Sequence, residues 1–65
     1  MDPRFECLVA FTNGETIRVG GFRFQPLRNG KVAVFTAGRF KPEITDWFGA
    51  AVRCGNLKRQ AAVWA

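Results

Sequence analysis

The 65-residue sequence contains no histidine, no serine and no tyrosine. Histidine is the commonest general base in enzymes and serine is a common nucleophile, so two usual catalytic groups are missing. No two of the five carboxylates stand at a spacing typical of acid–base catalysis, and Gly20-Gly21 does not open a helical pattern as a phosphate-binding loop would. We therefore predict that the protein is not an enzyme and uses no cofactor.

Cysteine is also scarce, with only Cys7 and Cys54. Two thiolates without histidine do not complete a tetrahedral zinc site within one chain, so no metal site is predicted. A disulfide is possible by count, but no apolar export signal follows Met1, and two buried free thiols are favoured. No apolar run reaches membrane-spanning length, so we expect a cytoplasmic protein without a membrane partner.

Hydrophobic residues are plentiful, at 48% of the chain, and include seven phenylalanines and two tryptophans. Aromatic side chains bury the most area per residue, so residues 1–65 can form a single small domain. A chain this short has little surface to bury, and pairing into a homodimer is one way to gain more.

From Arg4 to Phe11 every second residue is apolar, with Phe5, Cys7, Val9 and Phe11 on one face and Arg4, Glu6, Leu8 and Ala10 on the other, which predicts a strand. A second strand follows at Glu15–Val19. A three-residue turn, with Gly14 in the left-handed region, would set Val9 opposite Ile17 and keep apolar side chains together.

The next hairpin repeats this pattern. Phe22 and Phe24 point to one face of a third strand, and alternation turns Arg23 to the other face. A three-residue turn at 28–30 would place Phe24 opposite Val34 and Phe22 opposite Thr36, which again matches apolar neighbours.

A short fifth strand is expected near Phe40, followed by a helix over 42–54 that begins with Pro42 and ends at Gly55. Its core-facing stripe is Ile44, Trp47, Phe48, Ala51 and Val52. Residues 55–65 fit either a short second helix or a frayed tail.

Together these patterns predict an α+β fold. A small antiparallel β-meander of four to five strands, curled or barrel-like, occupies about residues 4–41, and one C-terminal amphipathic helix packs on it.

Ten lysines and arginines stand against five acidic residues, and the resulting formal net charge of +5 favours an anionic partner. The outward positions of the predicted sheet combine these cations with an exposed ring. The predicted binding residues are Arg18, Arg23, Lys31, Phe35, Arg39 and Lys41, with secondary contacts from Lys58, Arg59 and Trp64. Cations suit phosphates and a flat ring suits a base, so the pattern predicts binding of nucleic acid, either DNA or RNA.

Two alternatives remain open. The basic surface also fits a small regulatory or inhibitory protein, of the kind that phages encode, which docks on an acidic surface of a protein partner. It fits equally a solvated face that keeps a small protein soluble. The sequence does not decide between single and double strands.

Overall fold

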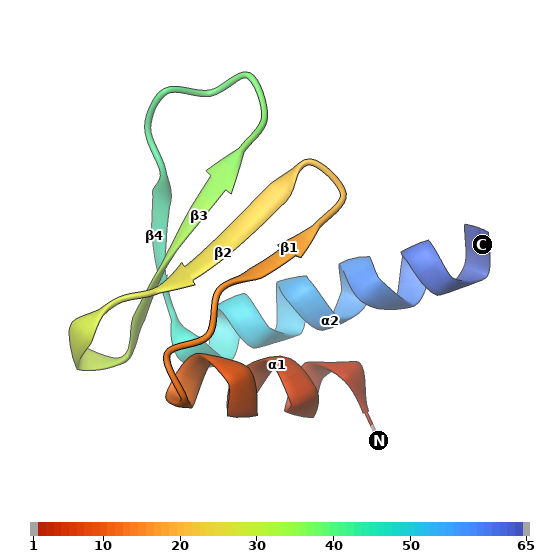
Figure 1. Ribbon diagram of the computed structural model, residues 1–65, viewed down its shortest axis with the longest axis horizontal. Helices are drawn as coiled ribbons and strands as arrows, with labels where there is room; N and C mark the ends of the chain where they lie inside the picture. Colours follow the sequence, from red (N-terminus) through yellow and green to blue (C-terminus); the bar gives the residue numbers. More distant parts are fainter. Residues whose placement is uncertain (1, 65) are drawn as a thin grey trace.

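The computed structural model describes residues 2–64, and the side chains of residues 2–61. Two helices lie side by side against one face of a four-stranded antiparallel sheet (Figure 1). The elements in chain order are α1 (Pro3–Thr12), β1 (Ile17–Val19), β2 (Phe22–Pro26), the 3-10 turn η1 (Arg28–Gly30), β3 (Lys31–Thr36), β4 (Glu43–Asp46) and α2 (Trp47–Trp64). The strand order β1-β2-β3-β4 is a simple meander. This confirms the predicted α+β fold with a C-terminal helix, while the sheet is open and not barrel-like.

The predicted first strand is wrong, because these residues form helix α1. Asp2 caps the helix by accepting a hydrogen bond from the Arg4 backbone N–H at 2.9 Å, and Pro3 occupies the first helical position. Cys7 and Phe11, four residues apart, therefore face the core, whereas Phe5 and Val9 are 55% and 42% exposed.

The turn expected at 12–14 is consequently the end of a helix. Gly14 does adopt a left-handed φ of 78°, but it carries the chain from α1 towards β1 and makes no hairpin. Ile17 pairs with Phe24 of β2, so the predicted pairing of Val9 with Ile17 is wrong.

The register predicted for the second hairpin is confirmed. Phe24 pairs with Val34 and Phe22 with Thr36, and the turn between β2 and β3 holds Asn29 and Gly30 at φ values of 63° and 73°. Asparagine and glycine tolerate this left-handed region better than other residues do, so the turn and the apolar pairing favour the same register.

The boundary between sheet and helix α2 lies later than predicted. Residues 43–46 form strand β4, and Phe40 lies fully exposed in the β3–β4 loop, where a fifth strand was expected. The Asp46 carboxylate accepts a hydrogen bond from the Gly49 backbone N–H at 2.6 Å and so starts the helix after β4. Helix α2 then runs through Gly55, which was expected to end it.

The core lies between the helices and the sheet. Its buried members are Cys7, Phe11, Phe24, Val32, Val34, Ala50, Ala51 and Cys54. The predicted apolar stripe of α2 is only partly correct, since Ala51 is buried but Phe48 is 71% exposed. The face of α2 that packs against α1 carries small side chains instead, because the two helices approach closely there. These side chains are Ala50, Ala51 and Cys54.

Candidate ligand-binding face of the sheet

One face of the sheet turns away from both helices, and its side chains follow from strand pairing. Cross-strand partners share a face, so the open face holds a row of Arg18, Arg23 and Phe35, and a second row of Gln25, Ala33 and Ile44. Lys31, two residues from Ala33 on β3, belongs to the same face. Asp46 pairs with Lys31 and so shares this face as well. We call these eight residues the open sheet face.

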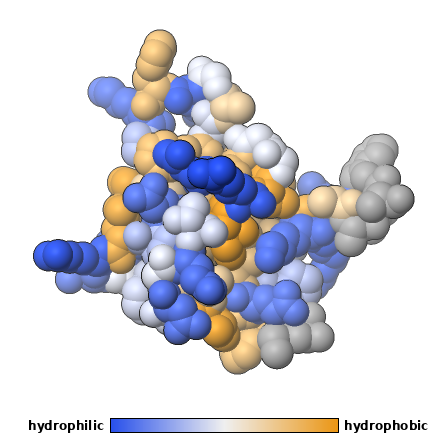
Figure 2. Space-filling model, in the orientation of Figure 1, coloured by the Kyte–Doolittle hydropathy of each residue, from blue (hydrophilic) through white to orange (hydrophobic). Residues whose placement is uncertain are grey.

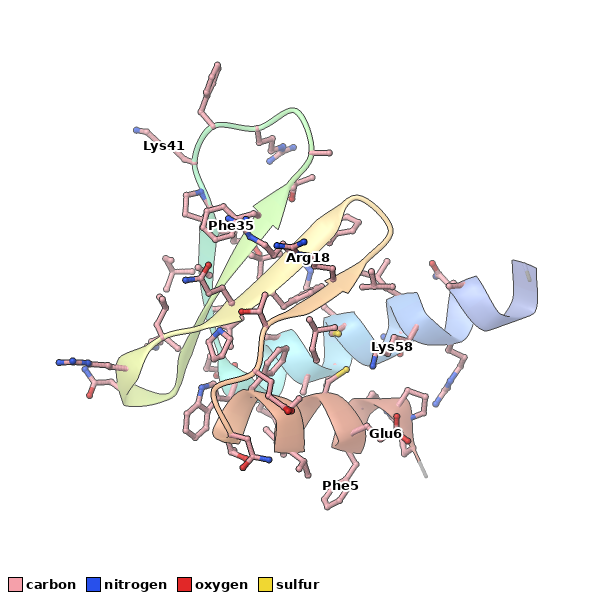
Figure 3. The ribbon with its side chains drawn as sticks, viewed as in Figure 1. Phe5, Glu6, Arg18, Phe35, Lys41 and Lys58 are labelled. Carbon is pink, nitrogen blue, oxygen red and sulfur yellow. The ribbon has the colours of Figure 1, made fainter. Side chains whose placement is uncertain are left out.

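The first row places two arginines and an aromatic ring side by side. The guanidinium carbon of Arg23 lies over the Phe35 ring, 4.2 Å from its centroid, which is within the range of a cation–π contact. Arg18 stands directly opposite Arg23 on the neighbouring strand. Figure 3 shows Arg18 and Phe35 over the same part of the sheet.

These two arginines carry charge that no acidic side chain neutralises. Within the part of the chain whose side chains the structure describes, the ion pairs are Arg4–Asp2, Arg53–Glu43 and Arg59–Asp2, and none includes Arg18 or Arg23. The Nε atom of Arg23 is buried and has no hydrogen-bond partner among these residues. Like charges placed opposite each other destabilise a sheet, so the row is electrostatically unfavourable until an anion joins it.

The second row supplies apolar surface beside this charge. Ala33 is only 4% exposed although it does not belong to the core, and Ile44 next to it is 55% exposed. Gln25 completes the row on β2. Ile44 lies on the edge strand β4, and its exposed, branched aliphatic side chain is a surface that a flat apolar group can cover.

A shallow hollow adjoins the first row near the β1–β2 turn. It has a volume of about 380 Å³, and its lining includes Arg18, Arg23 and Phe35 together with Gly20 and Gly21. The glycines lack side chains, which leaves room beside both guanidinium groups. In the space-filling view, hydrophilic side chains spread over the middle of the molecule with hydrophobic surface between them (Figure 2).

The structure brings together only part of the predicted site. Arg18, Arg23 and Phe35 are neighbours, and Lys31 lies on the same face beside Asp46. Arg39 and Lys41 lie in the β3–β4 loop and line another hollow, shared with Glu43 and Arg53. Figure 3 shows Lys41 on this loop.

The three secondary residues belong to helix α2. Lys58 is half-buried, and Arg59 lies 3.7 Å from the Asp2 carboxylate, so part of its charge is already neutralised. The side chain of Trp64 lies outside the described residues. Neither Lys58 nor Arg59 is on the open sheet face.

Sequence reasoning missed Ile44 and Gln25 as members of the site. Ile44 was assigned to a helix, and only its pairing with Ala33 places it on the open face. The alternation of Glu43, Ile44, Thr45 and Asp46 is the signal that was available, but four residues are too few to separate a strand from a helix start.

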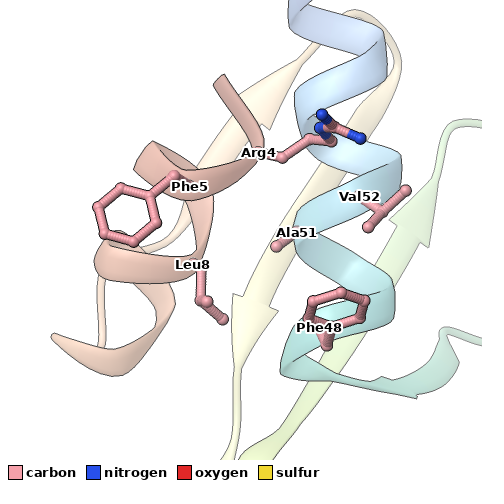
Figure 4. A pocket seen from close by; sticks show the side chains of 6 residues that line it. All are labelled: Arg4, Phe5, Leu8, Phe48, Ala51 and Val52. Carbon is pink, nitrogen blue, oxygen red and sulfur yellow. The ribbon is translucent and has the colours of Figure 1, made fainter. Parts of the chain in front are cut away.

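A second surface lies between the two helices. A groove of about 210 Å³ is lined by Arg4, Phe5, Leu8, Phe48, Ala51 and Val52 (Figure 4). Phe5 and Phe48 are both more than half exposed at its borders. The groove is mainly apolar, unlike the open sheet face.

Other chemistry is not evident in the described residues. They contain no group of three or more cysteine or acidic side chains that would hold a metal ion. Neither helix of the described chain has the length and apolarity needed to cross a bilayer.

The chain is thus a small α+β protein in which two helices cover one side of a four-stranded meander and the other side stays open. Comparison with protein-family models found no match, and comparisons with curated proteins and with solved structures found none either.

Proposed function

We propose that the protein is a non-enzymatic binding module that holds nucleic acid on its open sheet face. The observation that carries this proposal is the Arg18–Arg23 pair, which lies beside an aromatic ring and contacts no described carboxylate. A phosphate between the two guanidinium groups would relieve their repulsion and form charge-assisted hydrogen bonds with them.

The size of the charged surface sets an expected salt dependence. Three cations of the open sheet face, Arg18, Arg23 and Lys31, correspond to about three phosphate contacts. Each contact releases counterions, so the logarithm of affinity should fall with the logarithm of salt concentration at a slope of roughly −2 to −3. Arg39 and Lys41 lie at the loop beyond β3 and would add to this slope if a longer ligand reached them.

Fluorescence anisotropy with labelled oligonucleotides tests the proposal. The Arg18→Ala variant should lose affinity and reduce the salt slope by roughly one. Arg28→Ala is the matched control, because it also removes one exposed positive charge but lies in the turn η1. Equal losses for both variants would mean that only net charge matters, and binding that ignores salt would exclude phosphate contacts.

A second function, as a regulatory protein that docks on a protein partner, is favoured by the groove between α1 and α2. Exposed phenylalanines are costly to leave in water, and Phe5 and Phe48 border an apolar groove. On this hypothesis a partner binds with little salt dependence, and Phe48→Ala weakens binding much more than Arg18→Ala does. The reverse order of effects would favour the open sheet face.

A further inference from the structure

We propose that the open sheet face selects a single strand over a duplex, because it holds bases as well as phosphates. One base stacks on the Arg23–Phe35 pair and a second covers Ile44. This inference rests on the proposed function, since it concerns the ligand of the same face.

The Arg23–Phe35 pair offers a surface on which a nucleobase can stack. The guanidinium carbon lies over the ring, 4.2 Å from its centroid, so the two groups are in contact across β2 and β3. Aromatic rings and guanidinium planes both accept a nucleobase on their faces.

The second row makes the difference between single strand and duplex. Ile44 offers exposed apolar surface and no charge, so it gives a phosphate backbone no favourable contact. In a duplex the bases are paired and stacked inside, and only their edges reach the grooves. An unpaired strand instead turns its base faces outward, where Ile44 and the Arg23–Phe35 pair meet them.

The spacing of the two rows fits consecutive bases. Phe35 and Ala33 are two residues apart on β3, so the rows are separated by roughly 7 Å along the strand. Arg18 at one end and Lys31 at the other then lie where the phosphates on either side of the two bases would run. The face therefore takes a segment of two unpaired nucleotides at its centre.

Five fluorescein-labelled probes test this inference at low salt: dT10, U10, a ten-unit abasic deoxyribose-phosphate strand, a 12-base-pair duplex and a sulfated disaccharide. We expect dT10 or U10 to bind at least about 10-fold more tightly than the duplex and the abasic strand. The tighter of the two distinguishes DNA from RNA, which share the base faces and phosphates used here. The disaccharide measures attraction to anions alone.

Variants separate stacking from charge. Phe35→Leu keeps an apolar side chain without a ring, and it should weaken dT10 binding by about 5- to 100-fold while leaving the abasic strand unaffected. Phe40→Leu is the matched control, since Phe40 is fully exposed in the β3–β4 loop and away from this face. Circular dichroism verifies that both variants stay folded.

The outcomes distinguish this inference from the function on which it rests. If dT10, the abasic strand and the duplex bind equally and Phe35→Leu changes nothing, nucleic-acid binding stands but base stacking is wrong. If no nucleic-acid probe binds, the proposed function itself fails. If the uncharged change Ile44→Asn weakens dT10 binding as Phe35→Leu does and leaves the abasic strand unaffected, both rows of the face are engaged as proposed.

Discussion

The Sγ atoms of Cys7 and Cys54 lie 3.0 Å apart at the centre of the contact between α1 and α2, and both side chains are fully buried. The Cys7 thiol donates a weak hydrogen bond to the sulfur of Cys54. This confirms the expectation that both cysteines are buried free thiols that do not form a disulfide. The pair connects residues 47 positions apart in sequence, so it marks how tightly the first helix packs against the last.

The first prediction concerns the reactivity of these thiols. Burial, and then the interaction with the neighbouring Cys7 thiol, raise the pKa of Cys54 to about 12. At pH 8 the thiolate is therefore rare, and iodoacetamide should alkylate the folded protein at least 100-fold more slowly than the protein in guanidinium. Mass spectrometry after timed quenching measures both rates. Equal rates would mean that the helices separate readily.

The second prediction concerns the close approach of the two helices at Gly55. A Cβ atom at this position would lie 2.6 Å from the backbone N and Cα of Arg4. Gly55→Ala should therefore lower the free energy of unfolding by about 1–3 kcal/mol, although alanine favours a helix more than glycine does. Urea denaturation measures the loss.

Gly21→Ala is the control for this change. Its Cβ would meet Ala37 at 3.4 Å, and Gly21 does not have a positive φ. We expect a change within roughly 0.5 kcal/mol. If both variants lose equal stability, the close approach of Arg4 is not the reason why position 55 excludes a side chain larger than glycine.

The third prediction concerns the cap at the start of α2. Asp46→Ala removes the acceptor for the Gly49 N–H, which is 2.6 Å away, and should lower the free energy of unfolding by about 1 kcal/mol. Asp46→Asn keeps a side-chain acceptor and should therefore retain most of the free energy of unfolding that Asp46→Ala loses. A loss of the same size in both variants would assign the effect to the charge of Asp46, which also lies opposite Lys31.

The fourth prediction concerns pH. Hydrogen bonds from the Arg4 side chain, and then from its backbone, lower the pKa of Asp2 from 3.8 to about 2. Because the folded pKa lies below the unfolded one, the ionised carboxylate stabilises the fold above about pH 4, and this contribution is lost as the pH falls through about 2. Carboxyl carbon shifts in an NMR titration report this pKa directly.

Arg4→Gln tests the cause of that shift. Without the guanidinium group, the pKa of Asp2 should rise towards 3.8. Arg53→Gln, which breaks the ion pair of Arg53 with Glu43, should leave it unchanged. An unshifted Asp2 in the original protein would show that the Asp2–Arg4 pair does not persist in solution.

The N-terminal segment, predicted as a strand and found as helix α1, shows that a local apolar pattern can fit either element. Phe5, Cys7, Val9 and Phe11 alternate as in a strand, but Cys7 and Phe11 also stand four apart as on a helix face. A strand would put all four side chains on one face, whereas the helix buries only Cys7 and Phe11, so local spacing by itself does not reveal the helix. Two features favour the helix: the cap by Asp2, and the packing of α1 against Gly55 and Cys54 of α2. The packing contact joins segments about 50 residues apart in sequence, so local patterns do not reveal it.

The β2–β3 hairpin is the opposite case, because its information is local. Asn29 and Gly30 accept left-handed backbone, and the alternation on either side allows one register that keeps Phe24 beside Val34. The same alternation turns Arg23 and Phe35 to the other face, so the centre of the candidate site was predictable. Ile44 was not, since its place depends on β4 pairing with β3.

By itself, the amino-acid sequence determined the meander's central hairpin, the α+β class and the excess of positive charge, because each depends on neighbours within a few positions or on composition. Only the tertiary structure decided that the first segment is a helix, that β4 adds Ile44 to the open sheet face, and that Arg39 and Lys41 lie apart from Arg18 and Arg23. These outcomes depend on packing between distant segments, whose free energy is not encoded in any single stretch of the chain.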